Sequence, residues 1–171
     1  MIKVKAIETL YKGYKFRSRL EAKWAVYFDE IGLKWDYEIE GYELPNGDWY
    51  MPDFYIPRFG YIEIKALGQV TTKEIEKCRL LSTLENIKVS LFEGSPDFLT
   101  YMSFENGKEG CSIYFDCYTV RKWGQTPYYS GANHLSEQSD YCFYRENNCV
   151  CDYCKTKKAI EKAKNYRFNK Q

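Results

Sequence analysis

The stretch MPDFYIPRFGYIEIK, residues 51–65, contains two consecutive runs in which acids and a lysine alternate with apolar residues. Such alternation is typical of β-strands, because successive side chains point to opposite faces. Each run would therefore have an apolar face for a core and a second face with ionisable groups. On that second face we expect Trp49, Met51, Asp53 and Tyr55 from the first strand, and Tyr61, Glu63 and Lys65 from the second.

The residues between the two runs, 58–60, suit a three-residue hairpin loop. The last position of such a loop requires a positive φ, which Gly60 adopts without strain. With this loop, Asp53 would lie opposite Lys65 and diagonal to Glu63. A slip of one residue would move these groups to different faces.

Acids that share a half-buried sheet face need a cation between them. Two carboxylates about 4 Å apart repel by about 4 kcal/mol at an effective dielectric constant near 20. Lys65 supplies one positive charge, and a divalent metal ion supplies more. Hard oxygen ligands favour Mg²⁺ or Mn²⁺, which lower the pKa of bound water and stabilise charge on a phosphoryl oxygen. The alternative is a surface hairpin in which Glu63 and Lys65 are merely solvated.

Pro52-Asp53, followed by Glu63-Ile64-Lys65, resembles the signature of the PD-(D/E)XK nuclease superfamily. The preceding segment YKGYKFRSRLEAKWA, residues 11–25, is similar to the first helix of its small phage and bacterial members. The resemblance covers most of residues 11–93, with a weaker likeness in KAKNYRFNK near the end. It implies an α/β fold with a restriction-endonuclease-like core of order α-β-β-β-α-β, in which helices flank a mixed sheet.

The resemblance implies a metal-dependent nuclease that hydrolyses phosphodiester bonds, a DNA endonuclease of phage or bacterial origin. Asp53 and Glu63 would bind Mg²⁺, for which Mn²⁺ would substitute, and the backbone carbonyl of Ile64 would be a third ligand. Glu21 would complete or support the metal site. Lys65 would orient or deprotonate the attacking water and stabilise charge on the phosphate.

Glu21 also has a structural role open to it. Apolar residues recur at helical spacing from Phe16 to Ile31, and Gly32 follows where a helix end favours positive φ. If the helix starts at Arg19, Ser18 and Glu21 form an S-x-x-E capping box. One carboxylate cannot easily serve both as a cap and as a metal ligand.

The remaining elements follow from turn signals and apolar periodicity. We expect strands at 34–39 and 88–92, the second parallel to 61–65, a turn at 44–48 and a helix over 71–85. Runs 98–104 and 112–120 would form a hairpin that extends the sheet, and 121–140 a long loop. The chain thus divides into a basic arm (1–15), a nuclease core (16–93), an added hairpin (94–120) and a segment with a loop, a cysteine cluster and a basic helix at 155–168 (121–171).

Charge is spread unevenly, although the net charge is only +1. Residues 1–35 carry eight bases and four acids, residues 36–66 carry two bases and seven acids, and residues 155–170 carry seven bases and one acid. An acidic centre between basic ends fits a metal site flanked by phosphate-binding segments, although basic helices also serve solubility alone. The candidate phosphate contacts are Arg17, Arg19, Gln69 and Lys73.

Four cysteines, Cys142, Cys149, Cys151 and Cys154, lie within thirteen residues. Cys151 and Cys154 have the spacing of a zinc knuckle, but no second knuckle follows. Structural Zn²⁺ would need Cys142 or His134 to complete the ligand set. Free cysteines in a small core and a redox role stay open as alternatives.

The composition, 44% hydrophobic and 29% charged, is that of a globular protein, and 17 tyrosines offer rings for nucleobases. The start MIKVKAIETLYKG lacks the apolar core of a signal peptide, and no run reaches membrane-spanning length. We expect an intracellular protein of the cytoplasm, the host's if phage-encoded, that binds DNA rather than RNA and contacts no membrane. A homodimer would suit cleavage of both strands. The alternatives are a non-catalytic nucleic-acid or protein binding module on the same fold, and a nuclease that resolves branched DNA at junctions or flaps.

Overall fold

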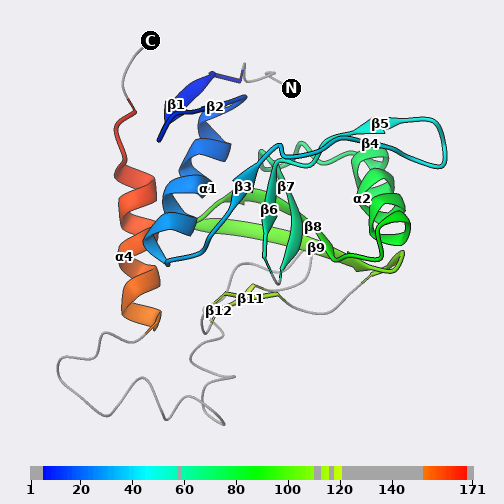
Figure 1. The fold of residues 1–171 in the computed structure, drawn as a ribbon. Coiled ribbons are helices and arrows are strands. Elements are labelled where there is room, and N and C mark those ends of the chain that lie inside the picture. The colour runs from blue at the N-terminus through cyan, green and yellow to red at the C-terminus, as the bar shows by residue number, and fades with distance from the viewer. Residues whose placement is uncertain (1–5, 58, 110–112, 116–117, 121–151, 169–171) are drawn as a thin grey trace, which may run out of the picture.

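A six-stranded mixed sheet forms the centre of the protein (Figure 1). The computed structural model describes residues 6–57, 59–109, 113–115, 118–120 and 152–168. The sheet order is β10-β9-β8-β7-β6-β3, in which β7 and β8 are parallel, as predicted, and the other neighbours are antiparallel. The strands are β3 (Asp36–Tyr37), β6 (Phe54–Ile56), β7 (Gly60–Lys65), β8 (Val89–Ser95), β9 (Phe98–Glu105) and β10 (Lys108–Glu109).

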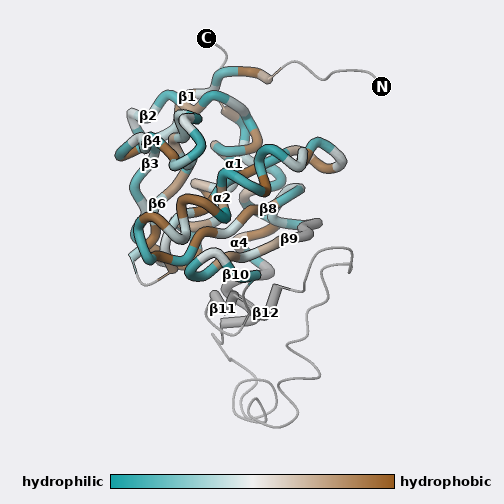
Figure 2. Tube along the Cα trace, turned by 90° about the vertical axis from the view of Figure 1, so that its right-hand side faces the viewer, coloured by the Kyte–Doolittle hydropathy of each residue, from teal (hydrophilic) through white to brown (hydrophobic). Residues whose placement is uncertain are grey.

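Helices cover both faces of this sheet. On one face, α1 (Arg19–Glu30) and α4 (Asp152–Asn165) pack against each other and over the apolar residues of β6 and β7. On the other face, α2 (Thr72–Leu84) packs against β8 and β9. Apolar residues accordingly concentrate along the central strands (Figure 2). No helix in the described ranges has both the length and the apolar character needed to cross a bilayer.

The predicted ends of α1 are confirmed. Ser18 is the N-cap, and its hydroxyl accepts a hydrogen bond from the Glu21 backbone N–H at 3.2 Å. Gly32 follows the C-cap residue Ile31 with a φ of +78°. Between these ends, the side chains of Trp24 and Phe28 are fully buried against the sheet.

The predicted helix at 71–85 is also confirmed, with Thr71 and Glu85 as its two caps. Thr71 and Glu74 form a reciprocal capping box, in which each side chain accepts a hydrogen bond from the other residue's backbone N–H. The buried side chains of this helix are Cys78, Leu81 and Ser82. The cap and this buried face together hold the start of α2 beside the end of β7.

Two small hairpins were not predicted. β1 (Thr9–Tyr11) pairs with β2 (Tyr14–Phe16), where the sequence predicts only an extended arm and the start of a helix. β4 (Tyr42–Glu43) pairs with β5 (Trp49–Tyr50) across the predicted turn at 44–48. The run 49–56 is therefore two strands, β5 and β6. Pro52 between them lacks the N–H that a continuous ladder would need.

The predicted hairpin after 98–104 is confirmed in part. β9 turns back at 106–107 and extends the sheet, but its hairpin partner is β10 and not the run 112–120. β9 also pairs with β8, because a tight turn at 96–97 brings it at once to the open edge of that strand. β11 (Ile113–Phe115) and β12 (Tyr118–Val120) pair with each other in a separate two-stranded sheet. The predicted loop at 121–140 lies outside the described residues.

The predicted register of the central hairpin is wrong by two residues. Phe54 pairs with Ile62 and Ile56 with Gly60, so counting back along β6 places Asp53 opposite Glu63, not Lys65. The reason is that Gly60, with a φ of +87°, is already the first residue of β7 and pairs with Ile56. Because the side-chain period of a strand is two, the acids nevertheless keep their common face.

Gly60→Ala should lower the free energy of unfolding by about 2 kcal/mol or more. Alanine is strained at this positive φ, and its Cβ would overlap the backbone carbonyl of Lys88. Urea denaturation followed by circular dichroism measures the change. Gly47→Ala is the matched control, since Gly47 has a similar φ of +80° but open space around it. Equal losses in both variants would show that the contact with Lys88 adds nothing.

Candidate active site

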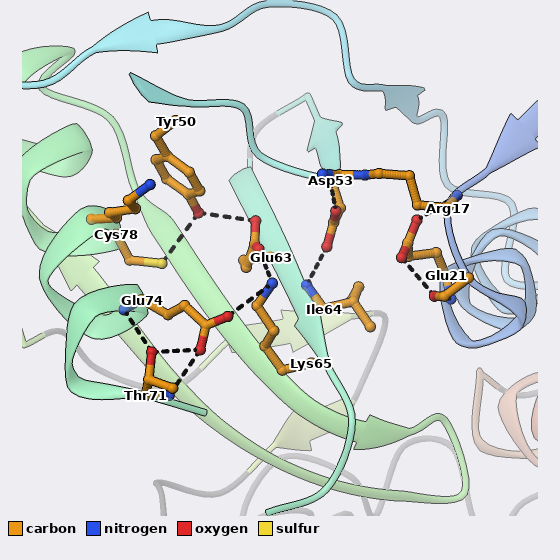
Figure 3. Close-up of polar contacts among 12 residues, drawn as sticks. Arg17, Glu21, Tyr50, Asp53, Glu63, Ile64, Lys65, Thr71, Glu74 and Cys78 are labelled. Carbon is orange, nitrogen blue, oxygen red and sulfur yellow. Dashed lines mark hydrogen bonds and ion pairs between the residues drawn. The ribbon is translucent and has the colours of Figure 1, made fainter. Parts of the chain in front are cut away.

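Asp53, Glu63 and Lys65 lie side by side on the face of the sheet that α2 covers (Figure 3). The two acids are 2% and 4% exposed, so both carboxylates are removed from water. Lys65 Nζ lies 2.6 Å from Glu63 Oε1 and 3.2 Å from Glu74 Oε1, which belongs to the first turn of α2. The three residues expected to share a site therefore do so, and Glu74 joins them.

Asp53 is fixed by two donors from different elements. Its Oδ2 accepts a hydrogen bond from the Ile64 backbone N–H at 2.7 Å, and its Oδ1 lies 2.8 Å from Arg17 Nη2. The Ile64 N–H is available because β6 pairs with β7 only as far as Ile62. In a strand the N–H and C=O of one residue point to the same side, so the Ile64 carbonyl is also directed toward Asp53.

Glu21 is engaged in structural contacts. Its side chain accepts hydrogen bonds from the Ser18 hydroxyl at 2.6 Å, the Tyr37 hydroxyl at 2.5 Å and the Arg17 backbone N–H at 3.2 Å. Only half of the predicted capping box therefore forms, because the Ser18 hydroxyl accepts from the Glu21 backbone N–H, whereas the Glu21 carboxylate binds the Arg17 backbone N–H and the Ser18 hydroxyl and not the Ser18 backbone N–H. Glu21 also lies close enough to Asp53 for its charge to raise the pKa of that carboxyl group. Its role as a metal ligand stays a prediction.

Burial and neighbouring charges shift the pKa values of Asp53 and Lys65. Burial raises the pKa of Asp53 well above its ordinary value, and the charges of Glu63 and Glu21 raise it further. Burial alone would lower the pKa of Lys65, but Glu63 and Asp53 outweigh it, so this pKa is raised. Lys65 is therefore an ammonium group at neutral pH in this arrangement and has no lone pair to accept a proton.

Tyr50 is a site residue that the sequence pattern missed. Its hydroxyl donates to Glu63 Oε2 at 3.1 Å and lies 3.3 Å from Cys78 Sγ on α2. The predicted neighbour on this face, Trp49, is instead 64% exposed. A break at Pro52 would have signalled this, because it ends the alternation that places Trp49 and Asp53 on one face.

Tyr50→Phe should lower the free energy of unfolding by about 1 kcal/mol. The variant keeps the ring but removes the hydroxyl that donates to the buried Glu63 carboxylate. Urea denaturation followed by circular dichroism measures the change. Tyr55→Phe, on β6 beside the same apolar cluster, is the control and should unfold like the wild type. Equal stability of Tyr50→Phe and Tyr55→Phe would show that the hydrogen bond to Glu63 adds nothing.

A pocket of about 430 Å³ opens onto Glu63 and Lys65. Two predicted phosphate contacts, Arg17 and Lys73, line it, whereas Gln69 and Arg19 do not. Lys73 makes an ion pair with Asp48 at 2.9 Å, and Arg17 pairs with both Asp53 and Glu38. The lining residues are Arg17, Trp49, Tyr50, Met51, Glu63, Lys65, Thr71, Lys73, Glu74 and Lys77.

Within the ranges that the structure describes, no group of three or more His, Cys, Asp and Glu side chains is arranged to hold a metal ion. At the candidate site, Arg17 and Lys65 contact the carboxylate oxygens. The predicted zinc ligands Cys142, Cys149 and Cys151, with the alternative ligand His134, lie outside the described residues. Cys154 lies in α4, where only its backbone is described.

Comparison of the chain with protein-family models, with curated proteins and with solved structures gives no match.

Proposed function

We propose that this protein is a metal-dependent nuclease that hydrolyses phosphodiester bonds in DNA. The observation that carries the proposal is the convergence of Asp53, Glu63 and Lys65, with the Ile64 backbone between them, beside a pocket rich in basic residues. Burying two carboxylates next to each other costs stability, and a site that binds a cation gives a reason to retain them.

The order of the elements supports a restriction-endonuclease-like core. Around the central sheet the chain runs α1, β3, β6, β7, α2 and β8, with β4 and β5 inserted between β3 and β6. This is the order α-β-β-β-α-β that the PD-(D/E)XK resemblance implies. Asp53 directly precedes the second strand of that order, and Glu63 lies in the third.

The residues present fit a hard divalent cation such as Mg²⁺ or Mn²⁺. The nearby donors are carboxylate and carbonyl oxygens from Asp53, Glu63 and Ile64, which such ions prefer. The pKa of Asp53 is raised first by burial and then by the charges of Glu63 and Glu21, so a cation bound between these acids would favour its carboxylate form. When bound, the ion would supply a more acidic water and stabilise charge on the phosphate.

The protein's own groups have distinct tasks in this mechanism. Lys65, held as an ammonium by Glu63 and Glu74, would donate hydrogen bonds to the phosphate and stabilise the charge that develops there. Tyr50 would keep Glu63 oriented. Lys65 would accept a proton from water only after the charges of Glu63 and Asp53, which raise its pKa, are neutralised by a bound cation.

The test is cleavage of supercoiled plasmid and labelled oligonucleotides by the wild-type chain with Mg²⁺, with Mn²⁺ and with EDTA. We expect a nicking activity that requires Mg²⁺ or Mn²⁺ and is abolished by EDTA. This activity should elute together with the protein in size-exclusion chromatography. Absence of cleavage with every substrate and both ions would contradict the proposal.

A non-catalytic binding module is the second candidate. The observation that favours it is that Arg17 and Lys65 already pair with Asp53 and Glu63, as they would in a site that has no need of a metal. This candidate predicts that the protein retards DNA on a native gel at the same affinity with Mg²⁺ and with EDTA, and never cuts it.

A further inference from the structure

Trp49 is the most exposed large apolar side chain among the described residues, at 64%. It lies at the end of the β4–β5 hairpin, which runs alongside α2 at the mouth of the candidate site (Figure 1). Nothing in the mechanism above uses it. A single exposed apolar side chain is ordinary on a protein surface, but this one lines a pocket that also has four cationic residues.

The ring and the backbone of Trp49 each have a contact. The ring lies against the backbone of Gly41, where any Cβ would overlap the ring. The Trp49 carbonyl accepts a hydrogen bond from Lys77 Nζ at 2.8 Å, and the preceding residue, Asp48, pairs with Lys73 at 2.9 Å. The hairpin is thus tied to α2, and the side of the ring away from Gly41 is left for a ligand.

The surroundings of the ring are those of a nucleotide site. Four cations line the pocket, Arg17, Lys65, Lys73 and Lys77, against the acids Glu63 and Glu74. Cations contact phosphate, while an exposed aromatic ring offers a base a stacking partner of any sequence. A basic peptide would be repelled by these cations. An acidic peptide would pair with the cations, but its carboxylate side chains would not stack on the indole.

We propose that Trp49 stacks on an unpaired nucleobase next to the phosphate held at Lys65, so that the preferred substrate is single-stranded DNA or the unpaired nucleotides of a flap or junction. A base inside a duplex is covered on both faces by its neighbours and has no face for the indole. The substrate class rests on the proposed nuclease function, but the stacking site does not.

The test measures affinity in EDTA, where cleavage cannot interfere. Fluorescence anisotropy with a labelled single strand and the matching duplex compares the wild type with Trp49→Ala and Trp49→Phe. We expect Trp49→Ala to weaken single-strand binding by about 5- to 100-fold and duplex binding little, and Trp49→Phe to retain most of the affinity. Tyr14→Ala, which removes a 40% exposed ring outside the pocket, should bind like the wild type.

Two outcomes overturn the proposal. One is an unchanged single-strand affinity in Trp49→Ala, and the other is an equal loss for single strand and duplex, which would mean that Trp49 only holds the hairpin. A thermal melt checks that the variants fold. If the wild type binds single strands through Trp49 but cleaves no DNA, the nuclease proposal fails and the stacking proposal stands. If cleavage depends on a metal ion but neither binding nor cleavage changes in Trp49→Ala, the stacking proposal fails and the nuclease proposal stands.

Discussion

Lys65→Ala should lower metal-dependent cleavage by at least about 100-fold, because it removes the only lysine that contacts Glu63 among the described residues. The ammonium group, 26% exposed at the pocket, is the cation best placed to reach a phosphate beside the two acids. The loss should fall on kcat, since the charge that Lys65 stabilises develops in the transition state. Single-turnover rates on a labelled oligonucleotide measure it.

Lys73→Ala is the matched control for this prediction. Lys73 lines the same pocket but is 66% exposed and pairs with Asp48, away from the acids. Its loss should raise KM a few-fold and leave kcat unchanged, as expected for a phosphate contact screened by water. Binding of Mn²⁺ by both variants, followed by calorimetry, separates a lost catalytic group from a disrupted site. Comparable cleavage by Lys65→Ala and the wild type would rule out the role given to Lys65.

The sequence alone was enough to bring the central residues together. Side chains on a strand alternate with a period of two. An error of two residues in the register therefore changed which residue lies opposite Asp53, but it left Asp53, Glu63 and Lys65 on one face. The ends of α1 and α2 were equally accessible, because Ser18, Gly32 and Thr71 act on their own neighbours in the chain. Local rules of this kind need no knowledge of the fold.

Contacts between distant segments were out of reach. Arg17 looked like a phosphate contact, and only the packing of β2 beside β3 and β6 shows it paired with Asp53 and Glu38. Tyr50 was missed because the break at Pro52 reverses the faces that simple alternation assigns. The pairing of β9 with β8 was missed, and its hairpin partner was placed at 112–120 and not at β10, because several runs in this part of the chain are strand-like in sequence. In each case the deciding energy comes from tertiary packing, which composition and period do not encode.

Arg17 also pairs with one of the two buried acids of the site. Asp53 is almost fully buried, and an unpaired buried carboxylate would cost several kcal/mol. The guanidinium supplies the missing charge from the surface, with 53% of its side chain still exposed. An arginine in this position can neutralise Asp53 and remain at the edge of the pocket that a phosphate would enter.

Trp24→Ala should cost about 4 kcal/mol of the free energy of unfolding, the largest stability effect we expect from one substitution. Trp24 is 1% exposed and joins α1 to the sheet, since its indole N–H donates to the Gly94 carbonyl at 3.0 Å. Its ring lies 5.2 Å from Phe92 and 5.5 Å from Phe28, measured between centroids. Truncation would leave a large cavity between helix and strand and an unsatisfied carbonyl.

Urea denaturation of Trp24→Ala beside Trp24→Phe separates these two terms. Phenylalanine keeps most of the apolar volume but cannot donate a hydrogen bond to Gly94, so it should cost clearly less stability than alanine. The difference between the two variants measures the cost of the cavity. Trp49→Ala is the control for losing a largely exposed indole, whose ring contacts Gly41 but is not in the core, and should stay within about 0.5 kcal/mol of the wild type. If Trp24→Ala were as mild as Trp49→Ala, α1 could not be packed on β8 through this ring, and the placement of Glu21 and Arg17 beside Asp53 would lose its support.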